Sequence, residues 1–177
     1  MIRIFDLVFS LLGLIFLSPL LIVILFIGFF DNGSPIFVQR RVGLNFKPFF
    51  LIKFRTMPMG VRSAATHLIK NVEFTSFGYF LRKTKIDEIP QLFNVLIGDM
   101  SLVGPRPCLF NQRKLISERK KRGVFKVRPG ITGLAPIEGI NMKTPTLLSK
   151  TDLKMIKNMS LYNYFYFIFK TIMQIFT

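Results

Sequence analysis

Several residue types are scarce in this sequence. Its 177 residues include one cysteine, Cys108, one histidine, His67, and no tryptophan. A small scaffold held together by disulfides needs paired cysteines, so that class of protein is excluded. Acidic residues are also few, because 9 Asp and Glu stand against 25 Lys and Arg and leave a net charge of +16. This balance indicates an anionic partner, such as a phosphate group, a nucleic acid or a membrane surface.

The sequence is nevertheless rich in apolar residues. Half of its residues are hydrophobic and Phe alone occurs 21 times, which excludes a disordered chain. The length suits one domain. Residues 7–30 contain no charged side chain, whereas residues 31–177 hold 24 basic and 8 acidic residues and so carry the whole net charge. The sequence therefore predicts a membrane segment followed by a cationic domain.

The apolar segment at residues 7–30 is compatible with two membrane arrangements. A straight helix of this length would be about 36 Å long, which spans a hydrocarbon core of about 30 Å. Ser18-Pro19 lies near its middle, where proline should bend the helix and the serine hydroxyl can bond a freed carbonyl. Basic residues flank both ends, which weakly indicates that both are cytoplasmic. These considerations favour a spanning helix but leave a re-entrant helix open.

The middle of the sequence predicts short elements. Residues 36–38 and 49–54 are expected to form a hairpin around turn residues 43–45. Residues 58–78 show no periodicity and are expected to form a loop, and a helix is expected from residue 113 to Gly123. Residues 161–176 are short for a membrane span but dense in Tyr and Phe. They are expected to form either an interfacial helix or a core helix.

Residues 81–107 form the most strongly patterned stretch. Apolar residues recur at helical spacing at Ile89, Leu92, Phe93 and Leu96, which predicts an amphipathic helix. Thr84 is the expected N-cap, and Pro90 is tolerated only in a first turn, so the helix should begin close to Asp87. Gly98 should end it.

Asp87 and Glu88 are the candidate catalytic residues. At a helix N-terminus the macrodipole would favour their ionised forms, and capping is the commoner use of acids there. Acids are scarce in this chain, however, and these two are adjacent. An ionised aspartate can attack phosphorus, and a neighbouring glutamate can hold Mg²⁺ against phosphate oxygens. The cations expected to bind a diphosphate are Arg82, Arg106, Lys53 and Arg55.

Four ordered stretches carry a resemblance to a known family. They are GSPIFVQRRVG at 33–43, KPFFLIKFRTM at 47–57, FLRKTKIDEIPQLFNVLIGDMSLVGPRP at 80–107 and VRPGITGLA at 127–135. With the Ser-Pro in the apolar segment, the sequence resembles the bacterial sugar transferases, the monotopic phosphoglycosyl transferases that begin glycan assembly on a polyprenol carrier. The match covers most of the chain, and the stretch at 80–107 is highly specific.

The resemblance implies a reaction and a site. A phospho-sugar would move from a UDP-sugar to polyprenol (undecaprenyl) phosphate with release of UMP. The resemblance implies the following roles: Asp87 as the nucleophile that forms a covalent phospho-sugar adduct, Glu88 as a ligand of Mg²⁺, Arg82 as a further catalytic residue, and Pro105, Arg106 and Pro107 as a motif in which Arg106 binds substrate phosphate. Arg128 is the best candidate for a nucleotide contact in the basic run at 113–128.

The resemblance also implies a fold and a location. Family members look like a re-entrant membrane helix, here residues 1–32, joined to a compact, mostly helical α/β catalytic domain, here residues 33–177, with a short hairpin and interfacial amphipathic helices. Ser18-Pro19 would turn the first helix back, which reverses the preference for a spanning helix. The protein would then lie in the bacterial cytoplasmic membrane with its catalytic domain on the cytoplasmic face.

Other readings of the sequence were weighed against this one. A membrane-tethered basic protein that binds nucleic acid or anionic lipid would explain the charge, but it leaves the Asp-Glu pair and the Pro-Arg-Pro motif unexplained, and nucleic acid is not expected as a partner. His67 is expected on the surface and Cys108 in the interior. Asp99 and Asp152 are left open between orienting backbone or metal and making structural hydrogen bonds. Asn45-Phe46-Lys47 and Pro136 depart from the family pattern. The sugar, the glycan pathway and the oligomeric state are left open.

Overall fold

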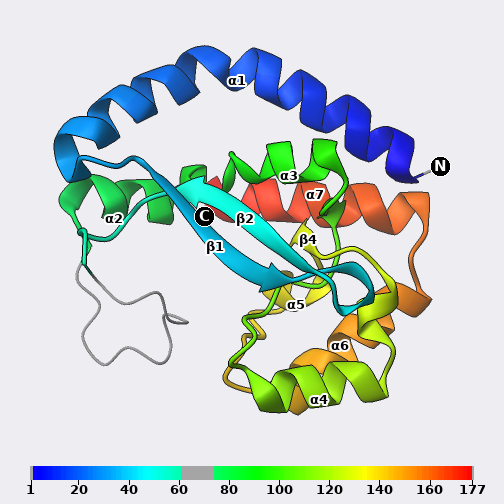
Figure 1. Ribbon diagram of the computed structural model, residues 1–177. Helices are drawn as coiled ribbons and strands as arrows, with labels where there is room; N and C mark the ends of the chain where they lie inside the picture. The colour runs from blue at the N-terminus through cyan, green and yellow to red at the C-terminus, as the bar shows by residue number, and fades with distance from the viewer. Residues whose placement is uncertain (1, 61–73, 177) are drawn as a thin grey trace.

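The computed structural model describes residues 2–60 and 74–176 (Figure 1). Its elements in chain order, with η for short 3₁₀ helices, are α1 (Ile2–Asn32), β1 (Ile36–Val42), η1 (Leu44–Phe46), β2 (Pro48–Phe54), α2 (Ser76–Lys83), η3 (Ile86–Glu88), α3 (Gln91–Ile97), β3 (Ser101–Val103), α4 (Arg113–Lys121), η4 (Val124–Lys126), β4 (Gly130–Thr132), α5 (Leu134–Ile137), α6 (Pro145–Lys157) and α7 (Leu161–Phe176). The described residues are thus mostly helical, with two small two-stranded sheets. This confirms the expected class of mostly helical α/β fold.

Helix α1 arches over the other elements as one continuous helix (Figure 1). Pro19 lies inside it and cannot donate a hydrogen bond to the carbonyl of Ile15 four residues earlier. The hydroxyl of Ser18 donates to that same carbonyl at 2.8 Å. The predicted bond of the Ser18 hydroxyl to a freed carbonyl is therefore confirmed, and the helical backbone continues through Pro19 without a break.

Helix α1 exposes apolar side chains along most of its length. Its buried residues are Asp6, Ser10, Ile24 and Gly28, whereas Phe16 is 76% exposed and Phe30 is 73% exposed. Among the described helices it is the one long and apolar enough to cross a membrane. A soluble monomer rarely exposes such a continuous apolar surface, which supports association of α1 with a membrane.

The hairpin of β1 and β2 is longer than the sequence predicted. The strands pair antiparallel with Gln39 opposite Leu51, and the connection contains Asn45 in the left-handed region at φ 51°. Asparagine tolerates this conformation better than most residues. The strands are joined to α3 by the buried amide of Asn94, which donates to the carbonyl of Phe50 at 2.8 Å and accepts from the amide of Ile52 at 3.0 Å.

The segment between α2 and α3 corrects two expectations. Thr84 is not an N-cap, because it follows α2 and its hydroxyl donates back to the carbonyls of Phe80 and Leu81. The long helix does not begin at Asp87 either, since η3 is a separate turn and α3 starts at Gln91 after Pro90. Gly98 ends α3 at φ 96°, as expected.

The apolar stripe predicted around α3 exists, but it faces helix α1 and the protein surface. Leu92 lies against Gly13 of α1 and Phe93 is 49% exposed. The face that packs against β2 is instead formed by the buried side chains of Asn94 and Val95. Helix α3 therefore lies between part of the hairpin and α1, while Phe54 at the end of β2 packs directly with Ile24 of α1.

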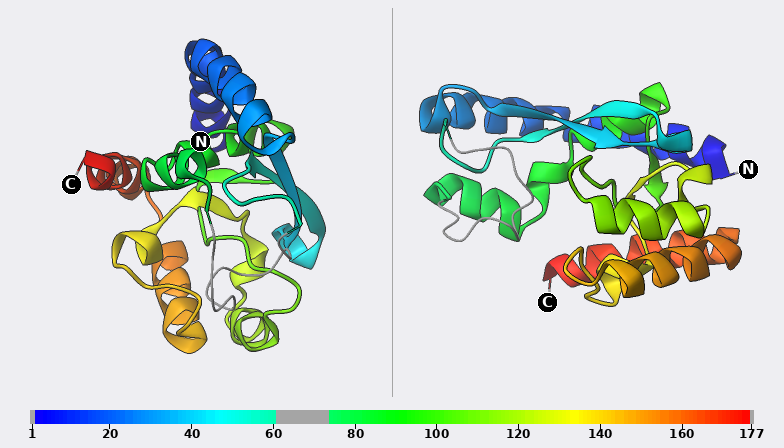
Figure 2. Two further views of the ribbon diagram at one scale, coloured as in Figure 1. Left: turned by 90° about the vertical axis from the view of Figure 1, so that its left-hand side faces the viewer. Right: turned by 60° about the horizontal axis from the view of Figure 1, so that its bottom comes forward.

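Strands β3 and β4 pair in parallel, Ser101 with Gly130 and Val103 with Thr132. A Cβ on Gly130 would lie 2.0 Å from the amide nitrogen of Gly104, so only glycine allows this approach. Helix α7 packs on both strands, and α4 packs on α6 at the opposite end of the domain from α1 (Figures 1 and 2). The sequence did not predict this sheet.

The membrane helix is fastened to the domain by a buried carboxylate. Oδ1 of Asp6 accepts hydrogen bonds from the hydroxyl of Ser101 at 3.0 Å, the amide of Leu102 at 2.9 Å and the hydroxyl of Tyr164 at 2.9 Å. Asp6 is 2% exposed and Tyr164 is fully buried. One side chain thus links α1, β3 and α7.

The remaining expectations had mixed outcomes. Residues 161–176 do form a helix, with Phe167 in the core and Tyr162 76% exposed, so α7 has both a core face and an exposed face. The helix expected from residue 113 ends at Lys121, two residues before Gly123. The loop expected at 58–78 is wrong for residues 76–78, which begin α2, while its centre and His67 lie outside the described residues. Cys108 is buried, as predicted.

Candidate active site

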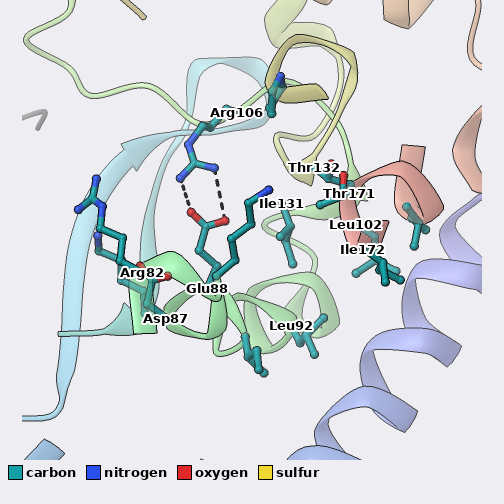
Figure 3. A pocket seen from close by; sticks show the side chains of 15 residues that line it. Arg82, Asp87, Glu88, Leu92, Leu102, Arg106, Ile131, Thr132, Thr171 and Ile172 are labelled. Carbon is teal, nitrogen blue, oxygen red and sulfur yellow. Dashed lines mark hydrogen bonds and ion pairs between the residues drawn. The ribbon is translucent and has the colours of Figure 1, made fainter. Parts of the chain in front are cut away.

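A cavity of about 490 Å³ contains the Asp-Glu pair. One end is lined by charged side chains from Lys53, Arg82, Lys85, Asp87, Glu88 and Arg106. The other end is lined by apolar side chains that include Ile89, Leu92, Leu102, Ile131, Ile168 and Ile172, with Thr132 and Thr171 beside them. Figure 3 shows the charged groups on one side and the apolar groups toward α7 and α1 on the other. The cavity is therefore amphipathic along its length.

The turn that holds the two acids is set by the backbone between α2 and α3. Lys85 adopts the left-handed conformation at φ 57°. The chain therefore changes direction between α2 and η3. The amide of Glu88 donates to the carbonyl of Lys85 at 3.1 Å, and that of Ile89 to Ile86 at 3.1 Å. This compact turn holds Asp87 with only 5% of its surface exposed.

Glu88 and Arg106 form a two-pronged ion pair across the charged end (Figure 3). Nη1 of Arg106 lies 3.4 Å from Oε2 of Glu88, and Nη2 donates to Oε1. Burial alone would raise the pKa of Glu88, but the charge and hydrogen bonds of Arg106 outweigh it and leave this pKa below its ordinary value. The charge of Glu88 in turn raises the pKa of Arg106. Both groups are therefore ionised at neutral pH.

The pKa of Asp87 is shifted in the opposite direction to that of Glu88. Burial, followed by the charge of Glu88, raises its pKa to about 6, against the opposing effects of Lys53, Arg82 and Arg106. The expectation that a helix macrodipole favours its ionised form is wrong, because η3 is a single short turn. With this pKa about nine in ten Asp87 side chains are still ionised at pH 7.

Lys53 brings a cation to the pair from strand β2. Burial lowers its pKa, although the charge of Asp87 acts in the opposite direction. Its position depends on the register of the hairpin, where it lies opposite Phe37, and on the amide of Asn94 that holds β2 to α3. The structure thus brings five of the predicted residues together: Lys53, Arg82, Asp87, Glu88 and Arg106.

Four other predicted site residues do not line this cavity. Nε of Arg55 donates to the carbonyl of Ser34 at 2.8 Å, and Nε of Arg128 donates to the carbonyl of Gly98 at 2.8 Å. Pro105 and Pro107 face a small cavity on the other side of their loop. These contacts are structural, and a direct substrate contact for the four residues stays a prediction.

Three polar residues of the cavity were not predicted from the sequence. Lys85 adds a cation, and Thr132 and Thr171 share a hydrogen bond between β4 and α7. Lys85 stands two residues before Asp87, so its proximity was a usable signal. The threonines come from segments 39 residues apart, and no spacing in the sequence indicates that they meet.

The acid pair fits a magnesium ion that is completed by substrate. Among residues 2–60 and 74–176 no group of three or more His, Cys, Asp and Glu side chains could hold a metal. Mg²⁺ characteristically binds through one or two carboxylates together with waters and substrate phosphates. Asp87 and Glu88 provide those two carboxylates, and the remaining ligands would have to come from water and a bound phosphate.

The whole sequence was also compared with known protein families. The model of the bacterial sugar transferase family matches residues 1–177. The chain belongs to the bacterial sugar transferase family. This confirms the resemblance carried by residues 33–43, 47–57, 80–107 and 127–135.

Several relatives in this family of sugar transferases have assigned names. The chain is 36% identical over 186 residues to the undecaprenyl-phosphate galactose phosphotransferase of Salmonella typhimurium, which covers 96% of the chain and 39% of that protein. It is 43% identical over 152 residues to a UDP-glucose:undecaprenyl-phosphate glucose-1-phosphate transferase of Klebsiella pneumoniae, covering 82% of the chain and 32% of that protein. An uncharacterized sugar transferase of Bacillus subtilis, EpsL, is 44% identical over 140 residues, covering 78% and 69%. The chain thus spans about two fifths or less of the first two.

Proposed function

We propose that this protein transfers a phospho-sugar from a UDP-sugar to undecaprenyl phosphate and releases UMP, as the first step of a bacterial surface glycan or glycoconjugate. The single observation that carries the proposal is the amphipathic cavity. Its charged end has the cations that a diphosphate requires beside two carboxylates. Its apolar end opens toward α1 and α7, where the tail of a lipid carrier would lie. The names of the relatives agree with both substrates.

The proposed reaction has two displacements at one phosphorus atom. A carboxylate oxygen of Asp87 bonds to the β-phosphorus of the UDP-sugar, and the bond from that phosphorus to the bridging oxygen breaks, so that UMP leaves with this oxygen. A phosphate oxygen of undecaprenyl phosphate then bonds to the same phosphorus and the bond to Asp87 breaks. The carboxylate of Asp87 is regenerated and the product is undecaprenyl diphosphate sugar.

The other charged residues have distinct tasks in this proposal. Lys53, Arg82 and Arg106 offset the charge of the diphosphate and orient it toward Asp87. Glu88, with Asp87, would hold Mg²⁺, which when bound neutralises phosphate charge near the nucleophile. The partly apolar surroundings keep the acceptor head at the boundary between lipid and water.

The topology forms a second part of the proposal. We infer that α1 is re-entrant, with both ends on the cytoplasmic side of the inner membrane. The proline inside the helix at Ser18-Pro19 and the basic residues on both sides of the apolar segment support this arrangement. A cysteine introduced at residue 2 should stay unlabelled when an impermeant thiol reagent is added outside intact cells. Labelling at that residue, with Cys108 replaced by alanine, would show a spanning helix.

The reaction is tested with the full chain in lipid or detergent. Purified protein is incubated with undecaprenyl phosphate, Mg²⁺ and a panel of UDP-sugars, and released UMP is measured. Asp87→Asn should lose turnover and also the phospho-sugar adduct that mass spectrometry detects on the peptide of the wild type. Glu138→Gln is the matched control, because Glu138 is exposed and outside the cavity. No UMP from any donor with folded protein, or a fully active Asp87→Asn, would refute the proposal.

A further inference from the structure

The loop that carries Arg106 is held through its carbonyl groups. Pro105 and Pro107 have no backbone N–H, so the loop has few donors of its own. Instead, the backbone carbonyls of four successive residues each accept a hydrogen bond. These residues are Pro105, Arg106, Pro107 and Cys108. The donors come from β1, α4 and β4, so the loop is fixed by the tertiary structure.

Two of those donors are backbone amides and two are arginine side chains. The amide of Gly130 donates to Pro105 at 3.0 Å, and the amide of Val42 donates to Cys108 at 3.0 Å. Nη1 of Arg41 donates to the carbonyl of Pro107 at 3.0 Å. Nη1 of Arg119 donates to the carbonyl of Arg106 itself at 2.8 Å.

Arg119 is an unusual donor because it is buried with a counter-ion. Its side chain and that of Asp152 are each 2% exposed. Nε of Arg119 donates to Oδ2 of Asp152 at 2.9 Å, and Nη2 lies 2.8 Å from the same oxygen. The pair joins α4 to α6, and its remaining guanidinium nitrogen points at the loop.

A buried ion pair is a poor means of stabilising a fold, because the cost of desolvation can exceed the attraction between the charges. Apolar residues could join α4 and α6 as well. They could not donate to the carbonyl of Arg106, and this is the contact that the pair makes beyond itself. This carbonyl is that of Arg106, whose side chain forms the ion pair with Glu88.

We infer that Arg119, oriented by Asp152, is a positioning residue that sets the place of the Arg106 guanidinium in the active site. The inference rests on the proposed function only for its effect on turnover. Loss of the contact should let the backbone at residue 106 move, and a displacement of about 1 Å at a phosphate-binding group lowers the rate about a hundredfold.

The test uses Arg119→Met/Asp152→Leu in the full chain. This variant removes both charges and leaves neither buried alone, so it should remain folded. Hydrogen exchange at the amides of Gly130 and Val42, which donate to the loop, should become at least about tenfold faster. The amide of Arg55, which donates to Pro35 at 2.7 Å in the hairpin, should be unchanged. Unchanged exchange at Gly130 and Val42 would overturn the inference, whether or not the protein proves to be a transferase.

Turnover provides the second readout. The double variant should lose about ten- to a hundredfold in kcat/KM in the wild-type background, but lose little more when Arg106→Ala is already present. An equal loss in both backgrounds would mean a general structural role and would overturn the inference. Glu118→Gln/Arg122→Gln is the matched control, because this ion pair joins a residue of α4 to the C-cap of the same helix, and Arg122 donates to Glu118 and not to the loop.

A conservative variant covers the case in which the double variant does not fold. Arg119→Lys keeps a charge beside Asp152 but has one ammonium group in place of a fork, and it cannot reproduce both contacts. It should speed exchange at Gly130 and Val42 and lower kcat/KM by about tenfold. Wild-type exchange together with wild-type kcat/KM in this variant would overturn the inference as well.

Discussion

The attachment of α1 to the rest of the protein depends on Asp6, and its removal should be costly. In Asp6→Ala the amide of Leu102 and the hydroxyls of Ser101 and Tyr164 lose the oxygen that accepts all three hydrogen bonds. A hydrogen bond to a charged group contributes about 1.5–3 kcal/mol. Because Ser101 can rotate and water can enter part of the space, we expect a net loss of about 3–5 kcal/mol, as for other broken buried pairs.

A smaller change at the same place gives a graded comparison. Tyr164→Phe removes one of the three donors and leaves the other two with their acceptor, so its cost should lie at the low end of the range for a hydrogen bond to a charged group, about 1.5 kcal/mol. For a protein of this size 1 kcal/mol shifts the melting temperature by about 2–4 °C. The expected decreases are therefore about 10 °C or more for Asp6→Ala and about 3 °C for Tyr164→Phe.

The assay is thermal unfolding of the purified variants in one detergent at one pH. Asp31→Ala is the control, because Asp31 lies on the same helix and is exposed, and it should shift the melting temperature by less than about 2 °C. If Asp6→Ala unfolds within 2 °C of the wild type, the buried carboxylate does not fasten α1. If Tyr164→Phe costs as much as Asp6→Ala, the estimate from separate hydrogen bonds is wrong.

Three further predictions concern the cavity and the segment before it. The kcat/KM for UMP release should fall as the pH is lowered through about 6, because Asp87 must be ionised to attack and its pKa in the free protein is raised to about 6; a kcat/KM that stays constant down to pH 5 would contradict this. A raised pKa also means that the ionised Asp87 destabilises the fold, so Asp87→Asn should melt above the wild type at pH 8, with the difference falling between about pH 6 and pH 4 and vanishing below about pH 4, the ordinary pKa of an aspartate. Gly78→Ala should destabilise the protein although Ala is the better helix former, because its Cβ would lie 2.2 Å from the carbonyl oxygen of Thr56; a raised melting temperature would refute that packing.

The elements that the sequence predicted correctly are those that local residues determine. Gly98 ends α3 because its left-handed conformation suits glycine, and the turn near Asn45 closes a hairpin between neighbouring strands. The pairing of Ser101 with Gly130 joins segments far apart in sequence, and each strand is too short for a recognisable period. Thr84 was predicted to begin a helix because its side chain has the chemistry of an N-cap. It is instead the C-cap of the preceding helix, α2.

The candidate site likewise has a part that the sequence predicted and a part that it did not. Asp87 and Glu88 were predicted because they are adjacent and because the surrounding stretch resembles a family. The apolar end of the cavity could not be predicted, since Leu102, Ile131 and Ile172 come from three elements that only the fold brings together. Arg55 and Arg128 carry the charge expected of phosphate ligands, yet their guanidinium groups donate to backbone carbonyls, which their residue type alone does not reveal.

The way the Pro-Arg-Pro loop is built determines how it can recognise a phosphate. Glycine-rich phosphate loops bind an anion through backbone amides. These donors are fixed in place and are always available to the anion. Here two of three residues lack an amide hydrogen and the carbonyls are occupied by donors from the interior, so the guanidinium of Arg106 is the donor that the loop can offer. A side chain can exchange one anionic partner for another, and Arg106 already has one in Glu88. If Arg106 binds substrate phosphate as proposed, that phosphate competes with the carboxylate of Glu88 for the guanidinium, and departure of the product would restore the ion pair.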